Sequence, residues 1–308
     1  MTSPGCTIHD HHHGWDRSLP PALVVMPGET VEFEVLDASG GQLGAQATLD
    51  DLRALDFGLV NPVTGPVFVE GAEPGDALIV EILEFAPSGV GWTANIPGFG
   101  LLADEFHDPY LKVWSYSGDF AEFLPGIRVP VRPFPGTIGN APAEAGQHSV
   151  VPPRRVGGNM DIRDLTAGTR LYLPVEVPGA LFSVGDTHAA QGDGEVCGTA
   201  IESAMRVTLR FGVQKQANFQ APRFSTPGPV TRHIDAGGYD VTTGIGPDLF
   251  EASRDAVRSM IDHLGREYQL DPYDAYLLCS VAADLRISEI VDAPNWLVSF
   301  YLPRAIFQ

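Results

Sequence analysis

The densest group of side chains that could do chemistry lies in residues 185–195, which read GDTHAAQGDGE. Asp186 and His188 are two residues apart, as are Asp193 and Glu195, so each pair shares a face if the chain is extended. The residues between the pairs, Ala-Ala-Gln-Gly, can fold the chain back and bring both pairs to one end of a sheet. Imidazole and carboxylates without a thiolate suit a divalent cation, zinc first, or a harder ion such as calcium if oxygens dominate.

A second interpretation makes this run a β-hairpin in which Asp and Gly form the turn and His188 is solvated. Three acids packed together would repel one another without a cation, however. Two paired acids, a histidine and three glycines within so short a run therefore favour a metal site over a plain turn.

Two smaller clusters could contribute to the same site. Asn159 and Asp161 follow a Gly pair and could present an amide beside a carboxylate, or they could form an Asx turn before a loop. The segment 10–16, DHHHGWD, places His12 three residues before Trp15, close enough to share a pocket wall. Consecutive histidines can also be adventitious chelators.

Other hydrolytic sites lack their key residues. The chain has no G-x-S-x-G nucleophile motif, and no serine cluster with a catalytic lysine stands out. Cys197 shares a strand face with Glu195, but the nearest lysine, Lys215, is distant, so we expect Cys197 to be a small packed residue. Glu202 has the opposite strand parity from Glu195 and would reach the site only through a bulge near Gly198.

The elements that must position these residues are mostly strands. Alternating apolar residues and Pro-Gly turns early in the chain predict strands, and helical spacing after Asp248 and after Asp271-Pro272 predicts two late helices, the first ended near Gly265 and the second carrying Leu285. The predicted fold is α+β and predominantly β, with a β-sandwich-like core. The strands are expected at 31–36, 78–83, 170–177, 181–184, 196–213 and 296–302.

Residues 86–160 are rich in Gly, Pro and aromatic side chains and predict short strands at best. Their aromatic residues would cover the core, line a pocket that closes over the site, or form an oligomer contact. We expect one domain over residues 1–308, and sequence echoes also suggest two related β sub-structures at about 10–160 and 161–308.

Composition excludes several classes of function. The 308 residues carry 19 Lys plus Arg against 39 Asp plus Glu, a net charge of −20, which disfavours nucleic acid and an anionic membrane surface. The start of the chain has no basic and apolar secretory signal, and no apolar run is long enough to span a membrane. Three widely spaced cysteines indicate free thiols, so we expect a cytoplasmic protein.

Several separated motifs, in order along the chain, together resemble the acetamidase/formamidase family. The specific one is GDxHAxQGDGE at 185–195, and the others are less distinctive. These are HxxW at 12–15, PGE at 27–29, GPV to GAEPGD at 65–76, GNMD at 158–161, LPV to GA at 173–180, and AYxLxS to DLRIS at 275–288.

The resemblance implies a soluble, oligomeric, metal-dependent enzyme that hydrolyses a short carboxamide of the formamide or acetamide type to carboxylate and ammonia. Carried onto matching positions, it points to His188, Asp193, Glu195 and the pair Asn159 and Asp161. In this hypothesis His188, Asp193 and Asp161, with His12, hold a metal that lowers the pKa of a bound water to roughly 7.

In the same hypothesis Glu195 accepts the proton of the water and passes it to the leaving ammonia. Asn159 or Gln191 binds the carbonyl or the NH₂ group of the substrate. Two alternatives remain: a hydrolase of a larger or cyclic amide on the same site, and a non-catalytic, metal-stabilised β module that binds a ligand.

Overall fold

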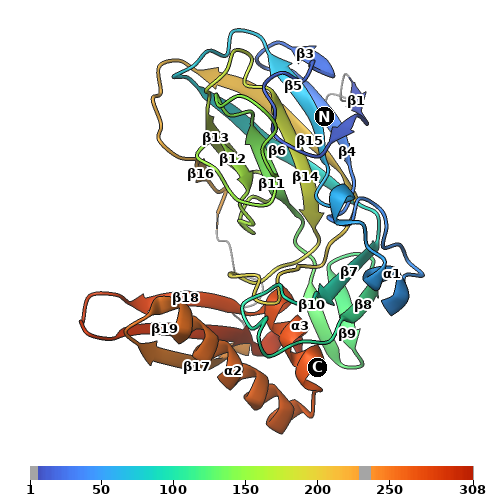
Figure 1. Cartoon of the computed structure of the whole chain (residues 1–308), viewed down its shortest axis with the longest axis vertical. Helices are drawn as coiled ribbons and strands as arrows, with labels where there is room; N and C mark the ends of the chain where they lie inside the picture. The colour runs from blue at the N-terminus through green and yellow to red at the C-terminus, as the bar shows by residue number, and fades with distance from the viewer. Residues whose placement is uncertain (1–5, 229–236, 308) are drawn as a thin grey trace.

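The computed structural model describes residues 6–228 and 237–307. Residues 1–5, part of the segment in which we expect no secretory signal, lie outside the described residues. Two large sheets form a sandwich, and the C-terminal helices and strands form a separate layer at the other end of the molecule (Figure 1). The predicted α+β class with a sandwich-like core is confirmed.

The first large sheet has six strands, of which only β1 and β4 are parallel. Its buried residues alternate along β4, where Val31, Phe33 and Val35 face the core as the period of two predicts. In spatial order the strands are β1 (Thr7–Ile8), β4 (Thr30–Val35), β15 (Met205–Gln214), β6 (Ala77–Pro87), β13 (Arg170–Pro174) and β16 (Arg223–Ser225).

The second large sheet packs on the first and carries the chemistry. Every residue of its neighbouring strands β11 and β14 is buried, and β14 ends at His188. In order the strands are β12 (Gly157–Asn159), β11 (Phe134–Asn140), β14 (Phe182–His188), β5 (Val63–Val69) and β2 (His11–His12), and β3 (Leu23–Val25) pairs in parallel with β5.

Three phenylalanine rings join the two sheets. Phe33 and Phe211 come from the first sheet and Phe182 from the second, and their ring centroids lie 5.1–6.2 Å apart in edge-to-face arrangements. Such aromatic pairs add to the free energy gained by burying apolar area. The start of β14, at the end opposite His188, is therefore fixed to a rigid core.

The C-terminal layer contains the two predicted helices, which begin directly after Asp248 and Asp271, and the side chain of each of these residues caps its helix. Beside this layer lie two hairpin-like strand pairs and a short helix that the sequence did not predict (Figure 1). The elements are α2 (Leu249–Tyr268), α3 (Pro272–Ala282), β17 (Tyr239–Gly246), β18 (Asp284–Glu289), β19 (Trp296–Pro303), β7 (Val90–Asn95), β8 (Tyr110–Ser115), β9 (Phe120–Leu124), β10 (Ile127–Pro130), α1 (Leu49–Arg53), η1 (Phe57–Leu59) and η3 (Arg304–Ile306).

Several boundaries differ from the sequence prediction. The strands expected to end at 83, 177 and 184 end at Pro87, Pro174 and His188. Helix α2 continues past Gly265 to Tyr268, and α3 ends at Ala282, so Leu285 lies in β18, where its N–H donates to the carbonyl of Asp193. The strand predicted at 196–213 begins only at Met205, because residues 196–204 follow an irregular path.

The segment 86–160 is more regular than predicted, since it contains strands β7 to β12. Most of its aromatic side chains cover a core, as Phe106, Trp114, Tyr116 and Phe123 are buried in the lower hydrophobic cluster with α2 and α3. Phe99 instead lines a cavity. Both of the non-oligomeric roles predicted for this segment are therefore present.

The two related sub-structures at about 10–160 and 161–308 stay a prediction. In both large sheets, strands from the two ranges are direct neighbours, for example β6 with β13 and β11 with β14. Among the described residues, no helix has the length and apolar character needed to cross a membrane.

Replacing the N-cap of α3 tests how this helix is held. The carboxylate of Asp271 accepts a hydrogen bond from the N–H of Tyr273 at 2.9 Å. We expect Asp271→Ala to lower the free energy of unfolding by about 1 kcal/mol, and Asp271→Asn to stay within about 0.5 kcal/mol of the parent, because asparagine also caps helices. Urea unfolding of the three proteins measures this; equal losses for both variants would contradict the capping role.

Candidate active site

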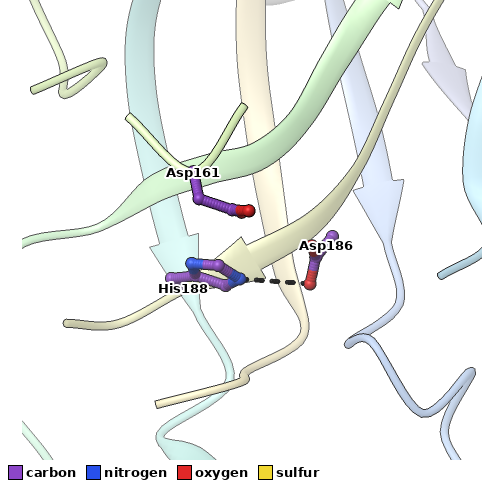
Figure 2. Close-up of side chains that lie close together, drawn as sticks. All are labelled: Asp161, Asp186 and His188. Carbon is purple, nitrogen blue, oxygen red and sulfur yellow. Dashed lines mark hydrogen bonds and ion pairs between the residues drawn. The ribbon is translucent and has the colours of Figure 1, made fainter. Parts of the chain in front are cut away.

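The site is built where β14 ends beside β11. Asp186 and His188 lie two residues apart on β14, and Asp161 comes from the loop after β12 (Figure 2). Gly136 on β11 faces them: a Cβ atom there would lie 2.7 Å from Asp161 Oδ1 and from His188 Cε1, and 2.9 Å from Asp186 Oδ2. Only glycine leaves this space open.

Two more carboxylates complete what we call the acidic centre: Asp161, Asp186, His188, Glu195 and Glu202. His188 Nε2 lies 3.1 Å from Asp186 Oδ1 and 3.2 Å from Glu202 Oε2. The ligand atoms of Asp161, Asp186 and His188 lie within 4.8 Å of one another, and so do those of His188, Glu195 and Glu202. His188 is thus common to two three-residue sets.

The backbone of this centre is unusual. Asp161, Asp186 and Glu195 have φ angles of 50°, 52° and 43°, in the left-handed region that residues other than glycine rarely adopt. Such conformations cost free energy and concentrate at functional sites, where the surrounding structure holds them. Three acids in this region at one centre therefore support a functional role.

Gln191 fixes the orientation of His188. Its side-chain NH₂ donates to the backbone carbonyl of Asp161 at 2.9 Å, so its Oε1 accepts from His188 Nδ1 at 2.8 Å. The Nδ1 of His188 then carries the proton, and Nε2 faces the carboxylates. This is the arrangement that presents an imidazole nitrogen to a cation.

Burial sets the protonation of the acids. It raises the pKa of Asp161 to about 7 and that of Glu202 to about 8. Removal from bulk water also raises the pKa of Glu195 well above its usual value, and the neighbouring Asp161 adds to this.

The opposite charges of the centre act on one another. Burial alone would lower the pKa of His188, but the carboxylates of Glu202 and Asp186 raise it well above its ordinary value. Burial would raise the pKa of Asp186, yet the His188 imidazolium holds it below its ordinary value. Positive charge at His188 therefore stabilises the acids around it.

The donor set fits a divalent cation. Asp161 Oδ1 and Glu202 Oε2 are buried and accept no hydrogen bond, which is costly for a carboxylate oxygen unless a cation lies nearby. The nearby thiol of Cys197 is fully buried among other partners, and burial raises its pKa to about 11, as expected for a packed residue. One nitrogen and several carboxylate oxygens suit zinc or a harder ion.

A cavity of about 400 Å³ opens directly above the acidic centre. Asp161, Asp186, Glu195 and Glu202 all line it, so the centre can be reached by a ligand. Asn159 also lines it, and its Oδ1 accepts from the hydroxyl of Thr137 at 2.6 Å, so its NH₂ group is the end that can donate into the cavity.

Known proteins resemble this chain over most of its length. The model of the Acetamidase/Formamidase family matches residues 5–150 and 143–308. The formamidase of Methylophilus methylotrophus is 30% identical over 96% of this chain and 89% of its own length. The chain belongs to the acetamidase/formamidase family. Membership identifies it as a hydrolase of linear amide C–N bonds, as the sequence resemblance implied.

Solved structures support the same assignment. A γ-lactamase from Delftia acidovorans superimposes with a TM-score of 0.88 at 29% identity, covering 97% of this chain and 89% of that chain. An acetamidase from Bacillus halodurans superimposes with a TM-score of 0.68 at 34% identity, covering 96% of each chain. The fold of this family member is therefore shared over nearly its whole length.

Two of the predicted metal ligands lie outside the acidic centre of this amidase. Asp193 Oδ1 is 3.3 Å from Arg163 Nε, and its side chain is 48% exposed. His12 contacts Trp15 as expected, but its Nε2 lies 2.9 Å from Ser183 Oγ and its Nδ1 lies 2.7 Å from the carbonyl of Gly14. Both ring nitrogens of His12 therefore already have partners.

The remaining predicted residues lie at the centre or beside it. His188 and Asp161 belong to it as predicted ligands, Glu195 as the predicted base, and Asn159 lines the cavity above. Gln191 was predicted to bind substrate, but both ends of its amide are used, so it positions His188 instead.

Glu202 is a residue that sequence reasoning admitted to the site only if a bulge near Gly198 intervened. The parity argument assumed a continuous strand through 196–213, whereas residues 196–204 are irregular and only a bridge to Trp92 and His188 places Glu202. Asp186 was part of the recognised run but was not proposed as a ligand. The signal available for Glu202 was its acidic side chain among apolar residues, AIESAM, which indicates a buried carboxylate.

An ion-pair network holds the loop that carries Gln191 and Glu195. Arg163 binds Asp284 through both terminal nitrogens, with Nη2 at 2.8 Å from Oδ2. The N–H of Gly192 donates to the carbonyl of Ser280 at 2.8 Å, and a Cβ atom at Gly192 would lie 1.8 Å from the carbonyl oxygen of Ala283. The C-terminal layer therefore fixes this loop from below.

The two acids on Arg163 form a matched pair of test sites. Asp284 is 1% exposed, so Asp284→Ala leaves the buried guanidinium with only the half-exposed Asp193 as an acidic partner, and we expect a loss of about 3 kcal/mol in the free energy of unfolding. Asp193→Ala, at a half-exposed site, should cost less than about 1 kcal/mol. Urea unfolding measures both.

Elemental analysis of the same variants separates the roles of Asp193. We expect Asp193→Ala to contain as much divalent cation as the parent protein, because the carboxylate faces Arg163. Loss of the cation from this variant, with a normal free energy of unfolding, would instead support the ligand role that the sequence predicts.

Proposed function

We propose that the chain hydrolyses a primary carboxamide of the formamide or acetamide type with the help of a divalent cation held by the acidic centre. The observation that carries this proposal is a pair of buried oxygens that accept no hydrogen bond, Asp161 Oδ1 and Glu202 Oε2, the second of them 3.2 Å from His188 Nε2, at the floor of a cavity. Asp161, Asp186, His188 and Glu202 would hold the cation, with zinc the first candidate and calcium the second. When bound, it supplies an activated water and polarisation of the amide carbonyl.

Glu195 is proposed as the group that moves protons. Its carboxylate lines the cavity, where it can reach a water, and burial raises its pKa, which makes it a stronger base than an exposed glutamate. The departing nitrogen of an amide needs such a proton, because NH₂⁻ is too basic to leave.

Other residues bind and orient. The NH₂ group of Asn159 can donate a hydrogen bond to the carbonyl oxygen of the substrate as negative charge develops there. Gln191 keeps the proton of His188 on Nδ1, so Nε2 stays available to face the cation. Gly136 preserves the space that a side chain would fill.

The cavity also bears on the competing proposal of a non-catalytic, metal-stabilised binding module. A structural cation is typically enclosed by protein ligands, whereas catalytic sites keep an open position. Four acids of the centre line a cavity of about 400 Å³, which supports the enzyme.

A cytoplasmic homo-oligomer stays our prediction, and the free thiols of Cys6, Cys197 and Cys279 support a reducing compartment.

Replacing Glu195 tests the proton-transfer role. We expect Glu195→Gln to lower kcat by about 10²–10⁴-fold, because the amide cannot accept the proton, while the cation stays bound. Ammonia release and elemental analysis of the same sample measure both quantities. Near-normal turnover would eliminate Glu195 as the base.

Removing the cation tests the whole arrangement. We expect the purified active enzyme to contain about one equivalent of a divalent cation, to lose ammonia release after chelation, and to regain it with the ion that elemental analysis identifies. Asp186→Ala should bind the ion at least about tenfold more weakly. A fully active protein without any bound ion would end the proposal.

A further inference from the structure

The cavity above the acidic centre is larger than a formamide or acetamide requires. Its volume of about 400 Å³ falls in the range of pockets for ligands of roughly 300–1,000 Å³, whereas acetamide has one methyl group beyond its amide. The polar residues that could handle an amide are concentrated on one side. The rest of the cavity therefore has room for a part of the substrate other than its amide group.

Apart from Asn61 and Thr199, the remaining walls are apolar. We call their apolar part the apolar chamber, and it comes mainly from two separate segments of chain, at 38–60 and 92–99, with Val151 from a third. Water in such a chamber is readily displaced by hydrocarbon, which gains free energy in proportion to the apolar area buried. The chamber is formed mainly by Leu55, Phe57, Val60, Trp92, Ile96 and Phe99.

The chamber is built rigidly onto the chemical centre. Trp92 is 3% exposed, and its indole N–H donates to Asp37 Oδ1 at 3.0 Å. Its backbone exchanges two hydrogen bonds of 2.9 Å with the backbone of Glu202, a member of the acidic centre. If the amide group of a substrate is bound beside Glu202, its acyl chain therefore extends toward the wall that contains Trp92.

The charge of the lining excludes one class of substrate. Four carboxylates line the cavity, and among the described lining residues none is lysine or arginine. A substrate with a carboxylate at the far end of its acyl chain would be repelled and would find no cationic partner.

We infer that this enzyme prefers uncharged primary amides with an apolar acyl chain of several carbons, which the apolar chamber binds while the amide lies at the acidic centre. The inference rests on the proposed amide hydrolysis and adds the acyl specificity. A primary carboxamide carries its only substituent on the acyl carbon, so the chamber receives the acyl group. Acetamide is then a substrate that leaves most of the chamber unused.

A chain-length series with the full-length metal-loaded enzyme tests the inference. Ammonia release is measured from acetamide, propanamide, butanamide and pentanamide, and from succinamate, which ends in a carboxylate. We expect kcat/KM to rise about fourfold for each methylene, or about 60-fold from acetamide to pentanamide. Succinamate should be hydrolysed more slowly than acetamide.

The possible failures are distinguishable. Hydrolysis of acetamide with a flat or falling chain-length profile, or rapid hydrolysis of succinamate, would overturn the acyl specificity and leave the proposed function intact. No ammonia from any of these amides would overturn the proposed function itself.

Two matched phenylalanines supply a control. Phe99 lines the chamber and is 49% exposed, and Phe120 is 47% exposed on β9, outside it. We expect Phe99→Ala to reduce the ratio of pentanamide to acetamide kcat/KM about fivefold, through lost apolar contact. Phe120→Ala should keep the parent ratio. Equal ratios in both variants would show that the chamber wall at Phe99 does not select the acyl chain.

Discussion

Four carboxylates around one imidazole in a buried pocket are the constraint on which this structure depends. Like charges cannot share an apolar environment unless some lose their charge or positive charge compensates them. Here burial raises the pKa values of Asp161 and Glu202, which favours their neutral forms. The carboxylates of Glu202 and Asp186 raise the pKa of His188, which favours its positively charged form. A bound cation would replace the proton at Nε2 and satisfy the oxygens that now accept no hydrogen bond.

Holding such a centre requires two different supports. The sandwich fixes Asp186 and His188 at the end of a fully buried strand. The segment with Glu195 and Glu202 has no regular strand to stabilise it. It is held by the ion pair of Arg163 with Asp284 and by hydrogen bonds to the chain around Asp284. The family fold therefore brings the end of a rigid strand, β14, and an anchored loop together at one site, as preorganisation requires.

The residues that sequence reasoning placed correctly depend on local rules. Asp186 and His188 share a face because the period of two holds along β14, and the N-caps of α2 and α3 follow from their own side chains. The same period failed for Asp193 and Glu195, because Gly194 and Glu195 have φ angles of 103° and 43° and turn the chain. Glu202 and the pairing of Arg163 with Asp284 depend on tertiary contacts that no local pattern in the sequence encodes.

The same division explains why family membership identifies the reaction more closely than the substrate. The acidic centre comes largely from the GNMD and GDTHAAQGDGE runs, which the resemblance recognised, and they form the floor of the cavity. The walls come mainly from 38–60 and 92–99, which that recognition did not use. The backbones of Trp92 and Glu202 exchange hydrogen bonds that join wall and floor, and the hydroxyls of Thr93 and Thr199 add hydrogen bonds between the same two segments; none of these bonds uses an apolar wall side chain. Wall side chains can thus change without altering the floor, so acyl specificity can vary while the chemistry is kept.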